Sequence, residues 1–133
     1  MGLVTSLHRL AQHTRNYARG VRREGTDPNH VRMQDVLCDF CHTPWTLDRP
    51  MVEGHHGSCI CGNCLRAAWA LTVTAQSSDR PDGTPTKCTM CLEERTDRTF
   101  QSPAYPDACI CLRCVRLASR AVARDADDAS KAE

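Results

Sequence analysis

The sequence predicts a small α+β protein made of two tandem units of one design, and its cysteines are the first reason. The chain has 133 residues and ten cysteines. Each cysteine of the first copy has a counterpart fifty positions later: Cys38 and Cys88, Cys41 and Cys91, Cys59 and Cys109, Cys61 and Cys111, and Cys64 and Cys114. Because chance does not reproduce five aligned cysteines, we interpret the pattern as an internal repeat.

Size is the second reason. Each unit has about 40 residues, and domains this small seldom fold on a hydrophobic core alone. Only 5% of the residues are aromatic, so large side chains that could fill a core are scarce. We therefore expect the cysteines to hold each unit together, through disulfides or through a metal ion.

The N-terminal region favours a metal over disulfides. Residues 1–30 contain several arginines and no uninterrupted apolar run, so they do not predict a secretory signal peptide. No stretch of the chain approaches the roughly 20 apolar residues of a membrane span. We therefore expect a cytoplasmic protein whose cysteines stay reduced or bind metal.

The spacing of the cysteines indicates zinc. In both copies a C-x2-C pair is followed, after nineteen residues, by a second C-x2-C pair, and two such pairs can surround one tetrahedral ion. We predict two Zn²⁺ ions, one per unit. The expected ligands are Cys38, Cys41, Cys61 and Cys64 in the first unit and Cys88, Cys91, Cys111 and Cys114 in the second. Structural zinc contributes roughly 10–16 kcal/mol per site, so we expect the metal-free chain to be largely unfolded.

Residues 1–30 are predicted to form a basic amphipathic helix and a linker. Leu3, Leu7 and Leu10 recur at helical spacing, and the helix is expected to end between Gly20 and Gly25. Three interpretations of this helix stay open. It packs on the first unit or on a second chain, it contacts nucleic acid or a membrane surface, or it is disordered.

The two units follow, separated by a linker rich in proline and small polar residues. The expected boundaries are residues 31–75 for the first zinc-binding unit, 76–86 for the linker, 87–125 for the second unit and 126–133 for an acidic tail. The helical pattern after Cys114 is expected to reach about Ala126, and the remainder of the chain is expected to fray.

Within each unit the local sequence predicts a knuckle, a hairpin and a helix, which together make a treble-clef-like zinc finger. The segment L-C-D-F-C at residues 37–41 is typical of a knuckle after a short strand, and C-G-N-C at residues 61–64 runs directly into a helical stretch. The second cysteine pair therefore lies in the first turn of a helix, where free N–H groups stabilise thiolates. The expected apolar helix faces are Leu65, Ala68 and Trp69 in the first unit and Val115, Ala118 and Val122 in the second.

Two cysteines and three histidines are left over by this scheme. Cys59 and Cys109 each stand two residues before a ligand, and each can be a buried thiol, an alternative ligand or half of a redox pair between the units. The histidines that are further candidate ligands in the first unit are His42, His55 and His56. Their counterparts are Leu92, Tyr105 and Pro106. Histidine is therefore not part of the shared design.

Several short motifs of the chain are similar to those of one known family. They are Cys38-Asp39-Phe40-Cys41, Met51-Val52-Glu53-Gly54, Ile60-Cys61 and Cys64-Leu65. In this order and spacing they resemble the ClpX-type zinc-binding domain, the N-terminal module of a protein-unfolding ATPase. The resemblance covers residues 31–73 and, more loosely, residues 84–124.

The chain departs from the family pattern at three places. His42 and Leu92 stand where the family usually has glycine, and Cys59 and Cys109 stand where aromatic residues are common. Residues 102–104, Ser-Pro-Ala, replace the apolar-Gly turn in the second copy.

The resemblance implies bound zinc on the same four ligands in each unit, pairing of the module through its apolar surface, and binding of peptides or adaptor proteins. No G-x-x-x-x-G-K-[ST] loop is present in the sequence, so ATPase activity is not carried over. A two-fold pair uses the same surface patch twice, so two tandem copies could form that pair inside one chain, through the helices at residues 65–71 and 115–122.

These features favour a non-enzymatic zinc-binding protein-interaction module that acts as an adaptor or regulator. We expect a protein or peptide partner, with self-association as a further option, and no membrane partner. The alternative is nucleic-acid binding, because nearly all basic residues are arginines, which suit phosphate contact. The arginines concerned are those of the N-terminal helix with Arg66, Arg113, Arg116 and Arg120. Against it, eight thiolates with two zinc ions make the bound protein net negative, and stacking aromatic residues are few. An enzyme is favoured less, since four thiolates leave zinc no open position. Zinc storage is favoured least, because a regular helix-forming sequence follows each second cysteine pair.

Overall fold

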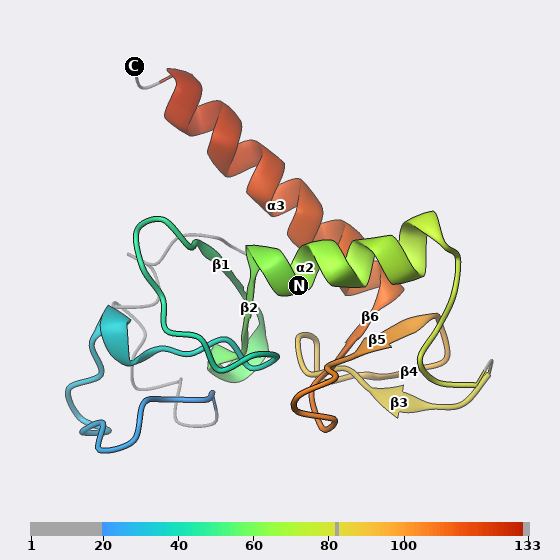
Figure 1. Ribbon diagram of the computed structural model, residues 1–133, viewed down its shortest axis with the longest axis horizontal. Helices are drawn as coiled ribbons and strands as arrows, with labels where there is room; N and C mark the ends of the chain where they lie inside the picture. The colour runs from blue at the N-terminus through green and yellow to red at the C-terminus, as the bar shows by residue number, and fades with distance from the viewer. Residues whose placement is uncertain (1–19, 82, 132–133) are drawn as a thin grey trace.

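The computed structural model describes residues 20–81 and 83–131 (Figure 1). The helix predicted near the N-terminus falls on residues 1–19, which lie outside the described residues. Residues 20–30 form bends and turns, and Arg22 makes an isolated antiparallel bridge with Val36. Within the described residues, no helix combines the length and the apolar content needed to cross a membrane.

The first unit consists of short elements around a two-stranded sheet. In order they are the 3-10 turn η2 (Met33–Asp35), strand β1 (Met51–Glu53), the 3-10 turn η3 (His55–Gly57), strand β2 (Cys59–Cys61), helix α2 (Gly62–Trp69) and the π-helical turn η4 (Ala70–Thr74). β1 pairs antiparallel with β2 and sets Val52 opposite Ile60, and both side chains are buried. Because β2 runs directly into α2, the strand fixes where the helix begins.

The second unit repeats the strand pair and the helix, and it has a small hairpin where the first unit has only the isolated bridge between Leu37 and Pro44. Strand β3 (Thr86–Lys87) pairs with β4 (Glu94–Arg95), strand β5 (Thr99–Gln101) pairs with β6 (Cys109–Cys111), and helix α3 (Leu112–Lys131) follows. The expected end of this helix near Ala126 is wrong, since α3 continues to Lys131. No glycine or proline interrupts that segment, and its alanines favour helix.

The first strands of the two hairpins are not separated by the same number of residues as the cysteines. β2 and β6 begin fifty residues apart, whereas β1 and β5 begin forty-eight residues apart. The second unit therefore has a shorter loop before its hairpin and a longer loop within it. Ser102, which follows β5, occupies the position of Gly54, which follows β1. The expected match of the family's turn to residues 102–104 is thus wrong by two residues.

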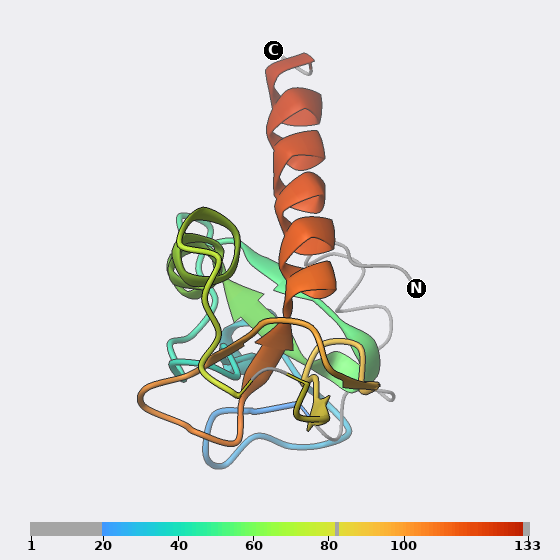
Figure 2. The same ribbon diagram turned by 90° about the vertical axis from the view of Figure 1, so that its right-hand side faces the viewer.

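Both units share one hydrophobic core. It includes Phe40, Ile60, Leu65 and Ala68 from the first unit and Met90, Ile110, Val115 and Ala118 from the second. α2 packs against α3. The expected helix faces are buried only in part, because Trp69 and Val122 stay 39% and 37% exposed. Figure 2 shows that α3 then extends well beyond the two units.

The contacts between the units are reciprocal. The backbone N–H of His55 donates a hydrogen bond to the carbonyl of Met90 at 2.8 Å, and the hydroxyl of Ser102 donates one to the carbonyl of Phe40. Met90 is the counterpart of Phe40 in the repeat, and Ser102 stands at the position of Gly54, beside His55. Each hairpin thus contacts the other unit's knuckle, which is the contact pattern of a two-fold dimer.

Candidate metal centres

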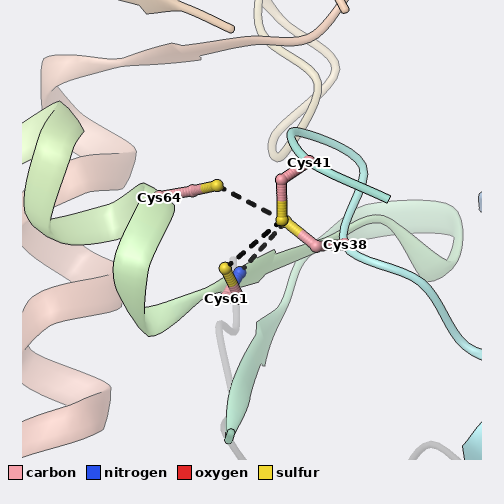
Figure 3. A group of neighbouring side chains, drawn as sticks. All are labelled: Cys38, Cys41, Cys61 and Cys64. Carbon is pink, nitrogen blue, oxygen red and sulfur yellow. Dashed lines mark hydrogen bonds between the residues drawn. The ribbon is translucent and has the colours of Figure 1, made fainter. Parts of the chain in front are cut away.

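The first cysteine cluster is assembled by three elements. Cys38 and Cys41 lie on the knuckle, Cys61 ends β2 and Cys64 lies in the first turn of α2, with their sulfur atoms turned toward one another (Figure 3). The Sγ atoms of Cys38 and Cys64 are 3.9 Å apart, and those of Cys41 and Cys61 are 3.7 Å apart. All four ligand atoms lie within 4.8 Å of one another.

This spacing fits a tetrahedral thiolate site. Zinc–sulfur bonds of about 2.3 Å place two sulfur atoms of a tetrahedron about 3.8 Å apart. The backbone N–H groups of Cys61 and Phe40 also donate to the sulfur of Cys38, at 3.3 and 3.4 Å. Such donors stabilise a thiolate, so the donor set and its surroundings both suit a soft divalent cation.

The second cluster repeats the first. The Sγ atoms of Cys88, Cys91, Cys111 and Cys114 also lie within 4.8 Å of one another. The N–H of Cys111 donates to the sulfur of Cys88 at 3.5 Å, as Cys61 does to Cys38. The structure therefore brings all eight cysteines predicted as ligands into two groups of four, each able to hold a metal ion.

Each knuckle is closed by two backbone hydrogen bonds. In the first, Cys38 donates to Thr43 at 3.0 Å and His42 donates to Cys38 at 2.7 Å; the second knuckle repeats these bonds at residues 88–93. The turn forces His42 and Leu92 into the left-handed region, with φ of 57° and 63°. This conformation is energetically unfavourable for residues with a Cβ, and glycine would therefore suit both positions.

The thiols of each cluster shift one another's pKa through hydrogen bonds. Hydrogen bonds from neighbouring thiols, led by Cys38, lower the pKa of Cys61 to about 2, and those led by Cys111 lower the pKa of Cys88 to about 2. The side-chain interaction with Cys61 raises the pKa of Cys38 to about 12. Hydrogen bonds within a cluster therefore favour the charged form of one sulfur and disfavour that of another. A divalent cation would release the remaining protons, so metal affinity should rise with pH.

The surplus cysteines lie outside both clusters. Cys59 is fully buried and its sulfur lies 3.6 Å from the carbonyl of Gly57. Burial raises the pKa of Cys59. Cys109 is 2% exposed, and its sulfur lies 3.7 Å from Nη2 of Arg80. Of the three interpretations left open by the sequence, the structure agrees with the buried thiol.

The three histidines do not join the first cluster. Neither His55 nor His56 reaches the sulfur atoms, and both are exposed on η3. The ring of His42 stacks on that of Tyr105, with centroids 3.4 Å apart. His42 thus links the first knuckle to the hairpin loop of the second unit.

Asp39 and Thr89 position the sheets against the knuckles, and the sequence reasoning missed them. Asp39 Oδ1 accepts from the N–H of Cys59 at 3.0 Å, and Thr89 Oγ1 accepts from the N–H of Cys109 at 3.0 Å. The N–H groups of Asp39 and Thr89 donate back to the carbonyls of the same two cysteines. The available signal was an acceptor side chain directly after the first cysteine in both copies.

No protein-family model, no curated protein and no solved structure matches the chain.

Proposed function

We propose that the protein is a zinc-binding interaction module of the ClpX type, in which two Zn²⁺ ions hold two treble-clef-like units and the surface between the helices binds a partner protein. The observation that carries the metal binding is the pair of four-sulfur clusters with tetrahedral spacing. Such sites contribute folding energy directly, because the ligands are brought together only in the folded chain. Four protein ligands leave the metal no open position, so the proposed role is binding and not catalysis.

A groove between α2 and α3 supports a protein partner. It has a volume of about 720 Å³ and is lined on its apolar side by Leu65, Trp69 and Val122. Trp69 is 39% exposed, although it lies on the helix face that the sequence predicted to be apolar. Exposed tryptophans beside grooves are typical anchors of protein interfaces.

The charged residues at this groove indicate which side chains a partner would carry. Arg49 and Arg66 line it together with one acidic residue, Asp48. An excess of positive charge around an apolar floor favours a peptide segment that carries both apolar and acidic side chains. We propose such a segment of a partner protein as the ligand.

The test is capture by the zinc-loaded protein from its own cell extract, compared with two variants. Trp69→Ala removes the anchor from the groove, and Tyr105→Ala removes an aromatic residue of similar exposure, 38%, that does not line it. The proposal predicts a partner that is lost with Trp69→Ala and retained with Tyr105→Ala. Capture that both variants retain would contradict the groove as the binding site.

Nucleic-acid binding is the second candidate, and one observation favours it. A hollow of about 340 Å³ beside α3 is lined by four arginines, Arg95, Arg113, Arg116 and Arg120, and by one acidic residue, Asp97. Arg95 and Arg113 pair with Glu93, at 3.3 and 3.5 Å, while Arg116 and Arg120 are exposed on one face of α3. Binding to a DNA or RNA duplex that weakens steeply with salt, and weakens further in Arg116→Ala and Arg120→Ala, would favour this function. Absence of binding at low salt would favour the first.

A further inference from the structure

We propose that the two metal sites differ in function: the first exchanges its ion with solution through a cavity, and the second is a closed structural site. This inference rests on the proposed zinc binding by both clusters. The first site would take a thiophilic divalent cation and yield it to a small chelating anion, while the second retains its ion.

The two clusters differ in exposure. Cys41 and Cys64 are half-buried, whereas their counterparts in the repeat, Cys91 and Cys114, are 5% and 0% exposed. The other ligands are closed to solvent in both units. The difference therefore concerns one ligand of the knuckle and one ligand of the helix, which face the same side of the first cluster.

A cavity of about 380 Å³ opens on that side. Its lining includes three ligands of the first cluster, Cys41, Cys61 and Cys64, together with Arg49. The volume can admit a small molecule as well as water. The guanidinium group of Arg49 favours the approach of an anion, so a negatively charged chelator can reach the sulfur atoms from this cavity.

Two helix positions beside the cysteine ligands carry side chains of different size in the two units. Asn63 and Ala67 line the cavity beside the first cluster. The same positions of α3, one before and three after the buried cysteine, carry Arg113 and Leu117. Leu117 packs against the hydrophobic core, whereas Ala67 is exposed. The second unit thus has large side chains where the first has small ones.

An ion pair links the knuckle and the helix of the second unit. Nη2 of Arg113 lies 3.5 Å from Oε2 of Glu93, which joins the start of α3 to the end of the second knuckle. The counterparts in the first unit are Asn63 and Thr43. The Oγ1 of Thr43 instead contacts the sulfur of Cys41 at 3.1 Å. No charged pair spans from knuckle to helix at these positions of the first unit.

Access controls exchange in a four-thiolate site. A competing ligand must reach the metal before the protein sulfur atoms leave it, and the side chains around a site set that access. When the chelator removes the ion, the four thiolates of the first cluster take up protons or a second divalent cation. The ligands of the second cluster are all closed to solvent, so this cluster should respond only when the unit opens.

The experiment measures zinc transfer from the full-length, zinc-loaded chain to an excess of the chelator 4-(2-pyridylazo)resorcinol by stopped-flow absorbance. We expect two phases of one zinc each, with rates separated by about tenfold or more. Ala67→Leu, which gives the first unit the residue of the second, should slow the fast phase by a similar factor. Ala70→Leu is the matched control, because Ala70 is exposed on the next turn and does not line this cavity.

The opposite substitution in the second unit tests whether a changed rate reflects access to the metal or a loss of folding. Leu117→Ala should accelerate the slow phase, with circular dichroism of the zinc-loaded variant showing that it stays folded. Two zinc ions released in a single phase, or a fast phase that Ala67→Leu leaves unchanged in a folded protein, would overturn the inference alone. A purified chain that takes up no stoichiometric zinc before the chelator is added would contradict the proposed function as well.

Discussion

The hydroxyl of Ser102 donates a hydrogen bond to the main-chain carbonyl of Phe40, joining the hairpin of the second unit to the knuckle of the first. The equivalent contact on the other side is made by the backbone N–H of His55, which donates to Met90 at 2.8 Å. The residue equivalent to His55 is Pro103, which has no N–H to donate. A serine in place of Gly54 therefore supplies through its side chain the bond that the backbone cannot.

Removing that hydroxyl should weaken the association of the two units. Ser102 and Phe40 are both 1% exposed, so Ser102→Ala leaves a buried carbonyl without this donor. We expect a loss of about 1–3 kcal/mol in the free energy of unfolding, measured by urea denaturation of the zinc-loaded protein. Ser77→Ala, at an exposed position, is the control. Equal midpoints for Ser102→Ala and the control would show that the bond contributes nothing.

Gly54 should tolerate no side chain. A Cβ at this position would lie 2.6 Å from the carbonyl oxygen of Met90 and 2.7 Å from Oγ of Ser58. Gly54→Ala is therefore expected to push the units apart at a cost of about 1–3 kcal/mol, seen as a lower melting temperature. At Gly62 a Cβ would meet nothing within 4 Å, so Gly62→Ala should leave stability unchanged or raise it. A Gly54→Ala variant as stable as the parent would contradict the close approach of the hairpin to the second knuckle.

Whereas Gly54→Ala should lower stability, replacing Leu92 of the second knuckle with glycine should raise it. Leu92 has a φ of 63°, and Leu92→Gly removes the clash of its Cβ at the expense of greater freedom in the unfolded chain. We expect a net gain of up to about 1 kcal/mol in calorimetric or denaturant measurements. His42→Gly should gain less, because it also removes the ring stacked on Tyr105. A destabilised Leu92→Gly variant would indicate that the leucine contributes more by packing than it loses by strain.

Stability should depend on pH through Asp39. Burial raises the pKa of this carboxyl to about 6, in spite of the N–H of Cys59 and the charge of Arg22. A carboxyl with a higher pKa in the folded than in the unfolded chain favours folding when protonated, so its contribution falls as the pH rises from about 4 to 6.

Thr89, the counterpart of Asp39 in the second unit, suggests the variant for this measurement. Asp39→Thr keeps an acceptor for Cys59, as Thr89 does for Cys109, and removes the charge. Its stability relative to the parent, both with saturating zinc, should grow by about 1 kcal/mol between pH 5 and pH 7 and then level off. A difference that stays constant over this range would contradict a raised pKa for Asp39.

The sequence alone predicted the features that depend on local spacing. The cysteine pairs, the helix that begins at each second pair and the order of knuckle, hairpin and helix follow from short motifs, and the structure contains them. The offset between Gly54 and Ser102 could not be predicted, because strand pairing across a loop of changed length decides it. The exposure of Trp69 depends on where α2 meets α3, which helical periodicity does not report.

We infer that one thiolate-bound metal ion holds each unit of the repeat. Elemental analysis of the freshly purified, reduced chain tests it most directly, together with variants that convert one cluster at a time. We expect two zinc ions per chain, one in Cys38→Ser/Cys61→Ser and one in Cys88→Ser/Cys111→Ser, with loss of helical circular dichroism when a chelator removes both. A parent chain that is folded with no stoichiometric metal would contradict it.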